Sequence, residues 1–172
     1  MMLNDLLFDI ERDLCRKPGF WMFLKYVFFK RSFQTVLLYR LRHLLSKKKY
    51  INKVNIFLDW FSFFLTSCDI HASAKIGKGM YFPHPVGVVI GKGCIIFDNV
   101  TIYQNVTLGR RSVDIPEYPT IHCGSTLCCG SVILGKIEIG ENTIIGANSV
   151  VTENCEPNST YVGVPGRKIR NA

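Results

Sequence analysis

The residue best suited to proton transfer is His84, which lies between Pro83 and Pro85. An imidazole titrates near neutral pH, so this side chain can accept a proton and return it within one reaction. Asp69 lies fifteen residues earlier, and a carboxylate can fix the tautomer of such an imidazole and stabilise its charged form. From the residues alone, a structural role is the commoner one for a histidine beside two prolines.

Cysteine is the other residue type with reactive or metal-binding chemistry. The chain has seven, at positions 15, 68, 94, 123, 128, 129 and 155. None belongs to a CxxC pair, and Cys123, Cys128 and Cys129 lack the spacing of a zinc site. The first residues are acidic rather than basic, which argues against a secretory signal. We therefore expect reduced thiols that serve packing, and no metal.

The formal net charge of +8 is concentrated in residues 1–66, where 12 Lys/Arg face 5 Asp/Glu. The remaining residues are nearly balanced, with 9 against 8. The basic segment could meet an anionic membrane surface or an acidic substrate, or could simply be solvated. No nucleic-acid-binding motif accompanies the charge, so we expect no nucleic acid partner.

Two segments with different periodicities must position these residues. Residues 1–66 are predicted to be α-helical, with apolar residues at helical spacing in Leu3–Leu14, Phe33–Leu44 and Val54–Leu65. The last stretch is too short to span a bilayer. The aromatic density exceeds what a small helical segment needs for its own core. We attribute the surplus to subunit contacts, to packing on the second segment or to a shallow membrane contact.

From residue 67 onward the period changes to six. Apolar residues recur at this spacing from Ile70 to Val106 and from Ile121 to Val151, and a companion set runs from Ile90 to Leu108. A six-residue unit makes one short strand and one turn, which cannot bury an apolar face alone. Such units must stack in register, three to a coil. Residues 67–172 are therefore predicted to form a mainly β domain, a parallel β-helix with Gly and Asn at its corners.

Residues 109–120 interrupt the repeat, because fifteen residues separate Val106 from Ile121. This loop is rich in charge and proline, including Arg110, Asp114 and Glu117. Loops that leave a rigid scaffold often carry function, because the scaffold positions them. We therefore expect the loop to contribute to function.

The chain resembles the left-handed β-helix acyltransferases, in particular serine acetyltransferases and the related enzymes that O-acetylate bacterial surface polysaccharides. The matching stretches are DIHASAKIGKG (69–79), VVIG (88–91), NVTIYQNVTLG (99–109), SVILGKIEIGENTIIGANSVV (131–151) and PNSTYVGVPGRKI (157–169). The resemblance implies a left-handed parallel β-helix with an N-terminal α-helical segment. It also implies a homotrimer that holds acetyl-CoA between neighbouring coils, and leaves open whether trimers pair.

The resemblance assigns roles to individual residues. His84 matches the general base that takes the proton of the acceptor hydroxyl, and Asp69 matches the carboxylate that orients it. A separation of fifteen residues is close to one full coil of about 18, so the two can stand on adjacent coils. The residues that match acetyl-CoA contacts are Gly109, Cys129, Ala147, Arg167 and Lys168. Small residues would admit the pantetheine arm, and the two cations would hold phosphates.

Two departures from the serine acetyltransferases bear on the acceptor. Pro83 stands where those enzymes place an Asp, and Glu117-Tyr118 stand where they place an Arg-His pair. Those groups hold the ammonium and carboxylate of an amino acid, and Glu117 would repel the carboxylate. We therefore predict an acetyl-CoA-dependent O-acetyltransferase for a saccharide hydroxyl, in a capsule, exopolysaccharide or O-antigen.

Several alternatives stay open. The chain could be a serine O-acetyltransferase of cysteine biosynthesis, could acetylate an antibiotic, or could be a non-catalytic β-helix scaffold that binds no CoA. A metal site of the gamma-type carbonic anhydrase kind would need a pair of histidines five residues apart, which His71, His84 and His122 do not supply. We expect a cytoplasmic protein, with its basic, aromatic N-terminal segment available to the inner face of the membrane.

Overall fold

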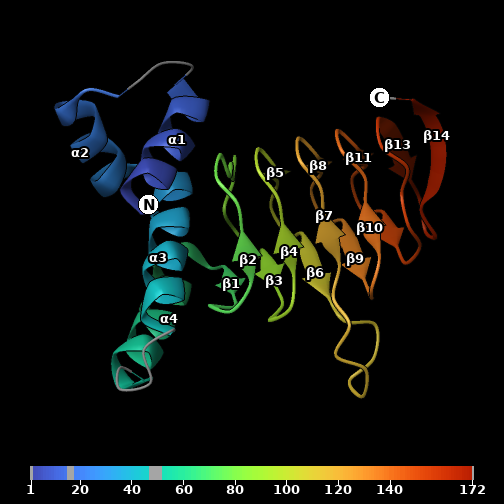
Figure 1. Cartoon of the computed structure of the whole chain (residues 1–172), viewed down its shortest axis with the longest axis horizontal. Coiled ribbons are helices and arrows are strands. Elements are labelled where there is room, and N and C mark those ends of the chain that lie inside the picture. The colour runs from blue at the N-terminus through green and yellow to red at the C-terminus, as the bar shows by residue number, and fades with distance from the viewer. Residues whose placement is uncertain (1, 15–17, 47–51, 172) are drawn as a thin grey trace.

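The computed structural model describes residues 2–14, 18–46 and 52–171. Helices gather at one end of a stack of β-strand coils, and the C-terminal strands lie at the other end (Figure 1). The last helix ends at Thr66 and the first strand begins at Asp69. Cys15 and the run Lys47–Lys49 lie outside the described residues.

The described part of the N-terminal segment folds into α1 (Met2–Leu14), α2 (Phe20–Phe29), α3 (Arg31–Ser46) and α4 (Asn52–Thr66). Helices α1, α3 and α4 cover the three predicted stretches, whereas α2 is an addition to the prediction. Its sequence, FWMFLKYVFF, is apolar on almost every side, so it offers no helical periodicity to detect. None of the helices in the described ranges is long and apolar enough to cross a bilayer.

The remaining described residues form short strands that stack into three sheets, one on each face of the coil (Figure 1). In chain order the strands are β1 (Asp69–Ile70), β2 (Lys75–Ile76), β3 (Val89–Ile90), β4 (Ile95–Ile96), β5 (Thr101–Ile102), β6 (Thr107–Gly109), β7 (Thr120–Ile121), β8 (Thr126–Leu127), β9 (Val132–Leu134), β10 (Glu138–Ile139), β11 (Ile144–Ile145), β12 (Val150–Val151), β13 (Ser159–Val162) and β14 (Arg167–Asn171). Sheet A has the order β1-β3-β6-β9-β12, sheet B β2-β4-β7-β10 and sheet C β5-β8-β11-β13-β14. Every described strand pair is parallel except β13 with β14. The predicted mainly β fold with N-terminal helices is therefore confirmed.

The core inside the coils is a column of large aliphatic side chains, each 0–2% exposed. They are Ile90, Ile96, Ile102, Leu108, Ile121, Leu127, Ile133, Ile139 and Ile145. Small buried residues such as Ser125, Ser131 and Ser149 fill the corners between them. Because each buried methylene contributes about 0.8 kcal/mol, this column holds the coils together. Val36 and Tyr39 of α3 continue the same core into the helices.

Polar side chains of the helices close the first coil. Three residues of α3 donate to its backbone carbonyls: Tyr39 to Ala74 (2.6 Å), Arg40 to Gly77 (2.8 Å) and Arg42 to Ile70 (2.9 Å). Arg40 also forms an ion pair with the buried Asp9 at 2.9 Å, and Asp9 accepts the backbone N–H of Met80 at 3.0 Å. Burial raises the pKa of Asp9, and the charge of Arg40 opposes that rise. These bonds satisfy backbone groups that the end of a strand stack would leave unpaired.

Candidate active site

His84 lies in a short insertion in the repeat. The strand register joins Asp69 to Val89 and then Val89 to Thr107, and the first of these coils is longer than the second by two residues. Tyr81, which pairs with Thr101 of the next coil, places the extra residues between itself and Val89. Apolar residues recur every six positions through this insertion, so the sequence does not reveal it. The prediction of an uninterrupted strand register from Ile70 to Val106 is therefore wrong at this turn. The lengthened turn leaves the His84 side chain exposed.

The turn that carries His84 is the first of a stack of turns at the edge where the chain passes from sheet C to sheet A. Backbone bonds join these turns: Asn105 N–H donates to Val86 O, Gly130 N–H to Gln104 O and Asn148 N–H to Cys129 O, each at 2.9 Å. We call this edge, residues 83–87, 104–105, 129–130 and 147–148, the His84 ridge. Three of the predicted site residues, His84, Cys129 and Ala147, therefore share one edge. At about 4.8 Å per coil, Ala147 lies about 14 Å along the ridge from His84.

Gln104 is a ridge residue that the sequence reasoning missed. It lies one coil from His84, and its side-chain Oε1 is buried without a hydrogen-bond partner among the described residues. A buried carbonyl oxygen without a donor costs free energy, so this atom can accept a hydrogen bond from a bound molecule. The signal was available in NVTIYQNVTLG, where Gln104 precedes Asn105 of a left-handed corner.

Asp69 stands one coil before the His84 turn. Gly87 N–H donates to Ser67 O at 2.8 Å, so the segment that leads into Asp69 runs beside that turn. The exposed carboxylate of Asp69 lines a cavity of about 380 Å³ together with His71. In the described part of the chain, no hydrogen bond or ion pair joins Asp69 to His84. The pairing of these two side chains stays a prediction.

His71 is held in the turn after β1. Its Nδ1 accepts the backbone N–H of Ser73 at 3.0 Å, which assigns the ring proton to the other nitrogen. Partial burial lowers the pKa of His71, and the positive charges of Lys92 and Arg42 lower it further. The ring is therefore neutral at neutral pH and serves as a turn residue.

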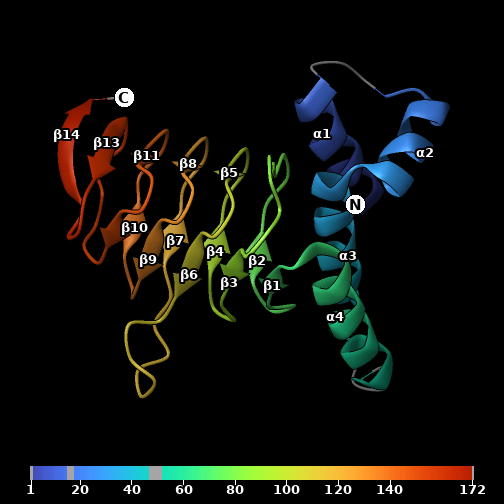
Figure 2. The same ribbon diagram turned by 180° about the vertical axis from the view of Figure 1, so that it is seen from behind.

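Gly109, the last residue of β6, lies at the opposite edge of sheet A from the His84 ridge. There the loop leaves the coil, and it rejoins at Thr120; both views show it projecting from the stack (Figures 1 and 2). Gly135 N–H donates to Gly109 O at 3.0 Å. The predicted acetyl-CoA contacts are therefore divided between two edges of the coil.

Arg167 and Lys168 lie at the start of β14, which pairs with β13 at the end of sheet C. Each forms an ion pair on the protein itself, Arg167 with Glu153 at 3.2 Å and Lys168 with Glu156 at 2.6 Å. The hydrogen bond from Lys168 raises its own pKa and lowers the pKa of Glu156. A phosphate would have to replace these carboxylates, which are exposed and therefore free to move aside.

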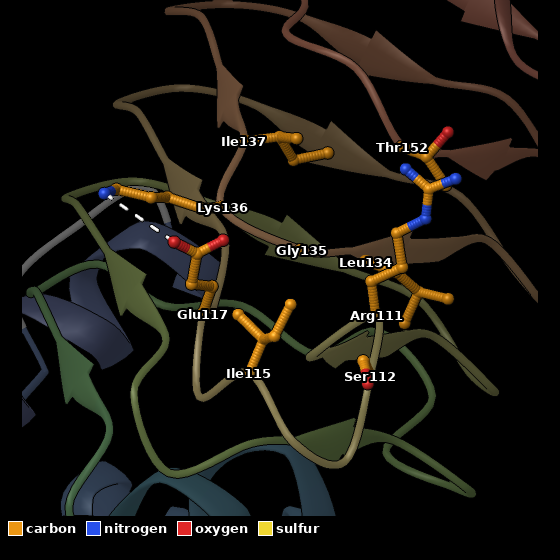
Figure 3. Close-up of a pocket in the computed structure, with 9 residues that line it drawn as sticks. All are labelled: Arg111, Ser112, Ile115, Glu117, Leu134, Gly135, Lys136, Ile137 and Thr152. Carbon is orange, nitrogen blue, oxygen red and sulfur yellow. Dashed lines mark ion pairs between the residues drawn. The ribbon is translucent and has the colours of Figure 1, made fainter.

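The loop and the following coil enclose a cavity of about 560 Å³ (Figure 3). Ile115 of the loop and Ile137 of the coil supply apolar walls, and Arg111 lies across the cavity from Lys136. Glu117 turns toward Lys136, with 3.9 Å between the carboxylate and ammonium groups. The loop therefore presents Glu117 to a cation of its own chain.

His122 lies on sheet B, away from the His84 ridge. Its ring stacks on Phe97 with centroids 5.1 Å apart, and its Nε2 lies 3.3 Å from Glu138. Within the ranges that the structure describes, no three His, Cys, Asp or Glu side chains are grouped to hold a metal ion.

Sequence comparison relates the chain to transferases with hexapeptide repeats. A family model described as bacterial transferase hexapeptide (six repeats) matches residues 118–153. A putative serine acetyltransferase of Schizosaccharomyces pombe is 31% identical over 169 residues, which cover 98% of this chain. A serine acetyltransferase of Staphylococcus epidermidis is 42% identical over 132 residues, which cover 74% of it. The matched region spans 62% of the length of each relative.

Solved structures extend the likeness over nearly the whole chain. A serine acetyltransferase from Brucella abortus in complex with coenzyme A superimposes with a TM-score of 0.90 at 31% identity. The match covers 99% of this chain and 68% of that one. The soybean serine acetyltransferase apoenzyme gives a TM-score of 0.87 at 32% identity, and covers 96% of this chain and 68% of that one.

The prediction of a saccharide acceptor and of a role in polysaccharide biosynthesis is wrong, because these relatives and structures are serine acetyltransferases. The departures at Pro83 and at Glu117-Tyr118 remain, and the structure places Glu117 3.9 Å from Lys136. By its match to solved structures across two thirds of their length, the chain belongs to the hexapeptide-repeat transferases of the serine acetyltransferase kind.

Proposed function

We propose that this chain is an O-acetyltransferase that moves the acetyl group of acetyl-CoA to the hydroxyl of L-serine. Its relatives with the same hexapeptide coil are serine acetyltransferases, and one of the matching structures holds coenzyme A. The observation that carries the proposal is the His84 ridge. It puts an exposed imidazole and the small residues Cys129 and Ala147 on one edge of a rigid coil.

His84 is the general base in this proposal. Its imidazole takes the proton of the serine hydroxyl as the oxygen attacks the thioester carbonyl. The C–S bond then breaks, and the proton passes from the imidazolium to the leaving thiolate, so atoms and charges balance. Pro83 and Pro85 restrict the backbone on both sides of His84, which limits the conformations of this turn before substrate binds.

Asp69 is the positioning residue in this proposal. Support comes from its place one coil before the His84 turn, where Ser67 O accepts the N–H of Gly87. The side chains of Asp69 and His84 are both exposed. A hydrogen bond between them would fix the tautomer and stabilise the imidazolium during transfer.

Acetyl-CoA is the co-substrate, and we propose that its pantetheine arm lies along the ridge past Cys129 and Ala147. The partly exposed Cys129 and the exposed Ala147 leave room for an extended arm close to the backbone. Gly109, at the other edge of sheet A, would contact the cofactor from a second chain. Arg167 and Lys168 would exchange Glu153 and Glu156 for phosphate oxygens.

A homotrimer with left-handed coils completes the proposal, as the family resemblance implies. Helices α2 and α4 expose large apolar side chains, among them Trp21 (81%), Trp60 (62%) and Phe64 (74%). Exposed apolar surface of this kind is usually buried in an interface, and we propose that a neighbouring chain of the trimer buries it. Light scattering together with sedimentation on anionic vesicles would separate this interface from a membrane contact, and a monomer in solution would contradict it.

Replacement of His84 by Ala tests the chemistry. We expect serine acetylation, measured as thiol release from acetyl-CoA, to fall about 10²- to 10⁴-fold. The shift in melting temperature on addition of CoA should stay unchanged, because the variant leaves the backbone of the ridge in place. His122→Ala is the matched control and should keep full activity. An active His84→Ala protein would place the base elsewhere, and wild-type protein without serine turnover would refute the acceptor.

A further inference from the structure

A second cavity lies on the other side of the loop from the one in Figure 3. It measures about 520 Å³ and opens where the loop passes the corner between sheets A and B. Three cations line it: Lys75 from β2, Lys92 from the turn between β3 and β4, and Arg110 from the start of the loop. Ile95 and Tyr118 supply an apolar wall. No Asp or Glu is among the residues that line it.

The cavity has a defined wall because the end of the loop is fixed on the coil. The ring of Tyr118 packs against Gly91 and Gly93, and a Cβ atom at Gly91 would come within 2.7 Å of that ring. Ile95 N–H donates to Pro119 O at 3.2 Å, so the chain after Tyr118 already belongs to the strand stack. The two glycines are therefore needed to seat the ring, and the ring holds this side of the loop.

The three cations are not neutralised by the protein. Within the described ranges, none of Lys75, Lys92 and Arg110 forms an ion pair, whereas Glu117 is turned to the opposite side of the loop. Arg110 donates only to the backbone oxygen of Val113, at 2.8 Å. Three like charges around one cavity repel one another, and an anion would offset that repulsion.

We propose that this cavity, the Lys75–Lys92–Arg110 pocket, binds the carboxylate or phosphate group of a small molecule. The guanidinium of Arg110 can present two N–H groups to an oxyanion, and the two ammonium groups add point charges. The apolar part of the ligand would pack on Tyr118 and Ile95. On the proposed function, the oxyanion is either the carboxylate of the amino acid acceptor or a phosphate of acetyl-CoA.

Calorimetric titration with inorganic phosphate tests the pocket without any need for turnover. We expect wild-type protein to bind phosphate and the Lys92→Gln/Arg110→Gln variant to bind it about 100-fold more weakly, about ten-fold for each lost charged contact. Lys25→Gln/Lys78→Gln removes the same charge at exposed sites away from the pocket and should bind as wild type does. Equal affinity in both variants, or no binding by wild type, would overturn the proposal.

Competition identifies the source of the oxyanion. L-serine that displaces phosphate would assign the pocket to the carboxylate, and CoA that displaces it would assign the pocket to the cofactor. If the double variant failed to fold, as judged by circular dichroism, Lys75→Gln alone should still weaken phosphate binding about ten-fold. Phosphate binding without any serine acetylation would refute the proposed function and leave the pocket standing.

Discussion

Two corners of the coil gain residues over the regular repeat, and they do so on different scales. The His84 ridge gains two residues between Tyr81 and Val89, which puts one imidazole on an exposed edge. The corner between sheets A and B gains a whole loop, so that Ile95 pairs with Thr120 on its far side. The coil after the loop returns to 18 residues, because Thr120 pairs with Glu138, and the last coil is two residues shorter, because Ile139 pairs with Cys155. The regular coils therefore supply rigidity, while the length of each insertion decides whether it presents one side chain or builds cavities.

The largest effect on stability should come from the regular part of the coil. Leu127→Ala removes a fully buried side chain from the central column. We expect a loss of about 2–5 kcal/mol in the free energy of unfolding, measured by urea denaturation, because the rigid column cannot close the cavity. Below the melting temperature, the KM values for serine and acetyl-CoA should not change. Leu127→Ile keeps the volume and should cost less than about 1.5 kcal/mol. A changed KM in fully folded Leu127→Ala protein would show that the core of the coil and the site are not independent.

The shorter insertion is tested next, through Asp69→Asn. If the carboxylate orients His84, kcat should fall about ten-fold, which corresponds to about 1.4 kcal/mol, with the KM for acetyl-CoA unchanged. Asp114→Asn, which removes an exposed carboxylate of the loop, is the control. An unchanged kcat would make Asp69 a turn residue only.

The smallest effect is expected at the loop corner, from Tyr118→Ala. The ring is only partly buried, so its loss should cost about 1 kcal/mol in stability. The loop should become looser on the coil, and phosphate affinity at the Lys75–Lys92–Arg110 pocket should fall a few-fold. Tyr118→Phe keeps the ring over Gly91 and Gly93 and should bind phosphate as wild type does. A stronger effect of the Phe variant than of the Ala variant would contradict the seating of this ring.

Much of the fold could be predicted from the sequence, because each repeat must bury an apolar side chain in the same core and the requirement recurs in every coil. An aliphatic side chain at every sixth residue is needed wherever a short strand faces a common core, as Ile121, Leu127 and Ile133 do. Two features could not be predicted in this way. Helix α2 is apolar all round and has no period, and the insertion at His84 keeps the six-residue spacing while it changes which residues pair.

The candidate site could be predicted only in part. His84, Cys129 and Ala147 share an edge because each belongs to the same corner of successive coils, which the motifs imply. The predicted saccharide acceptor is wrong because the relatives that match the chain are serine acetyltransferases, although Pro83 and Glu117 differ from the residues expected for an amino acid acceptor. Lys75, Lys92 and Arg110 come together only through the geometry of the loop and the coil below it, so no spacing in the sequence reveals their pocket.

The hydrogen bonds that close the two ends of the strand stack affect how the protein behaves at high concentration. Open strand edges can add further strands from other molecules, which is the route to fibres. At one end, side chains of α3 occupy the carbonyl groups that a new strand would need. At the other end, β14 runs antiparallel along β13, and Gly166 N–H donates to Val150 O. These bonds occupy backbone groups at both ends of the stack, which disfavours the addition of further coils end to end.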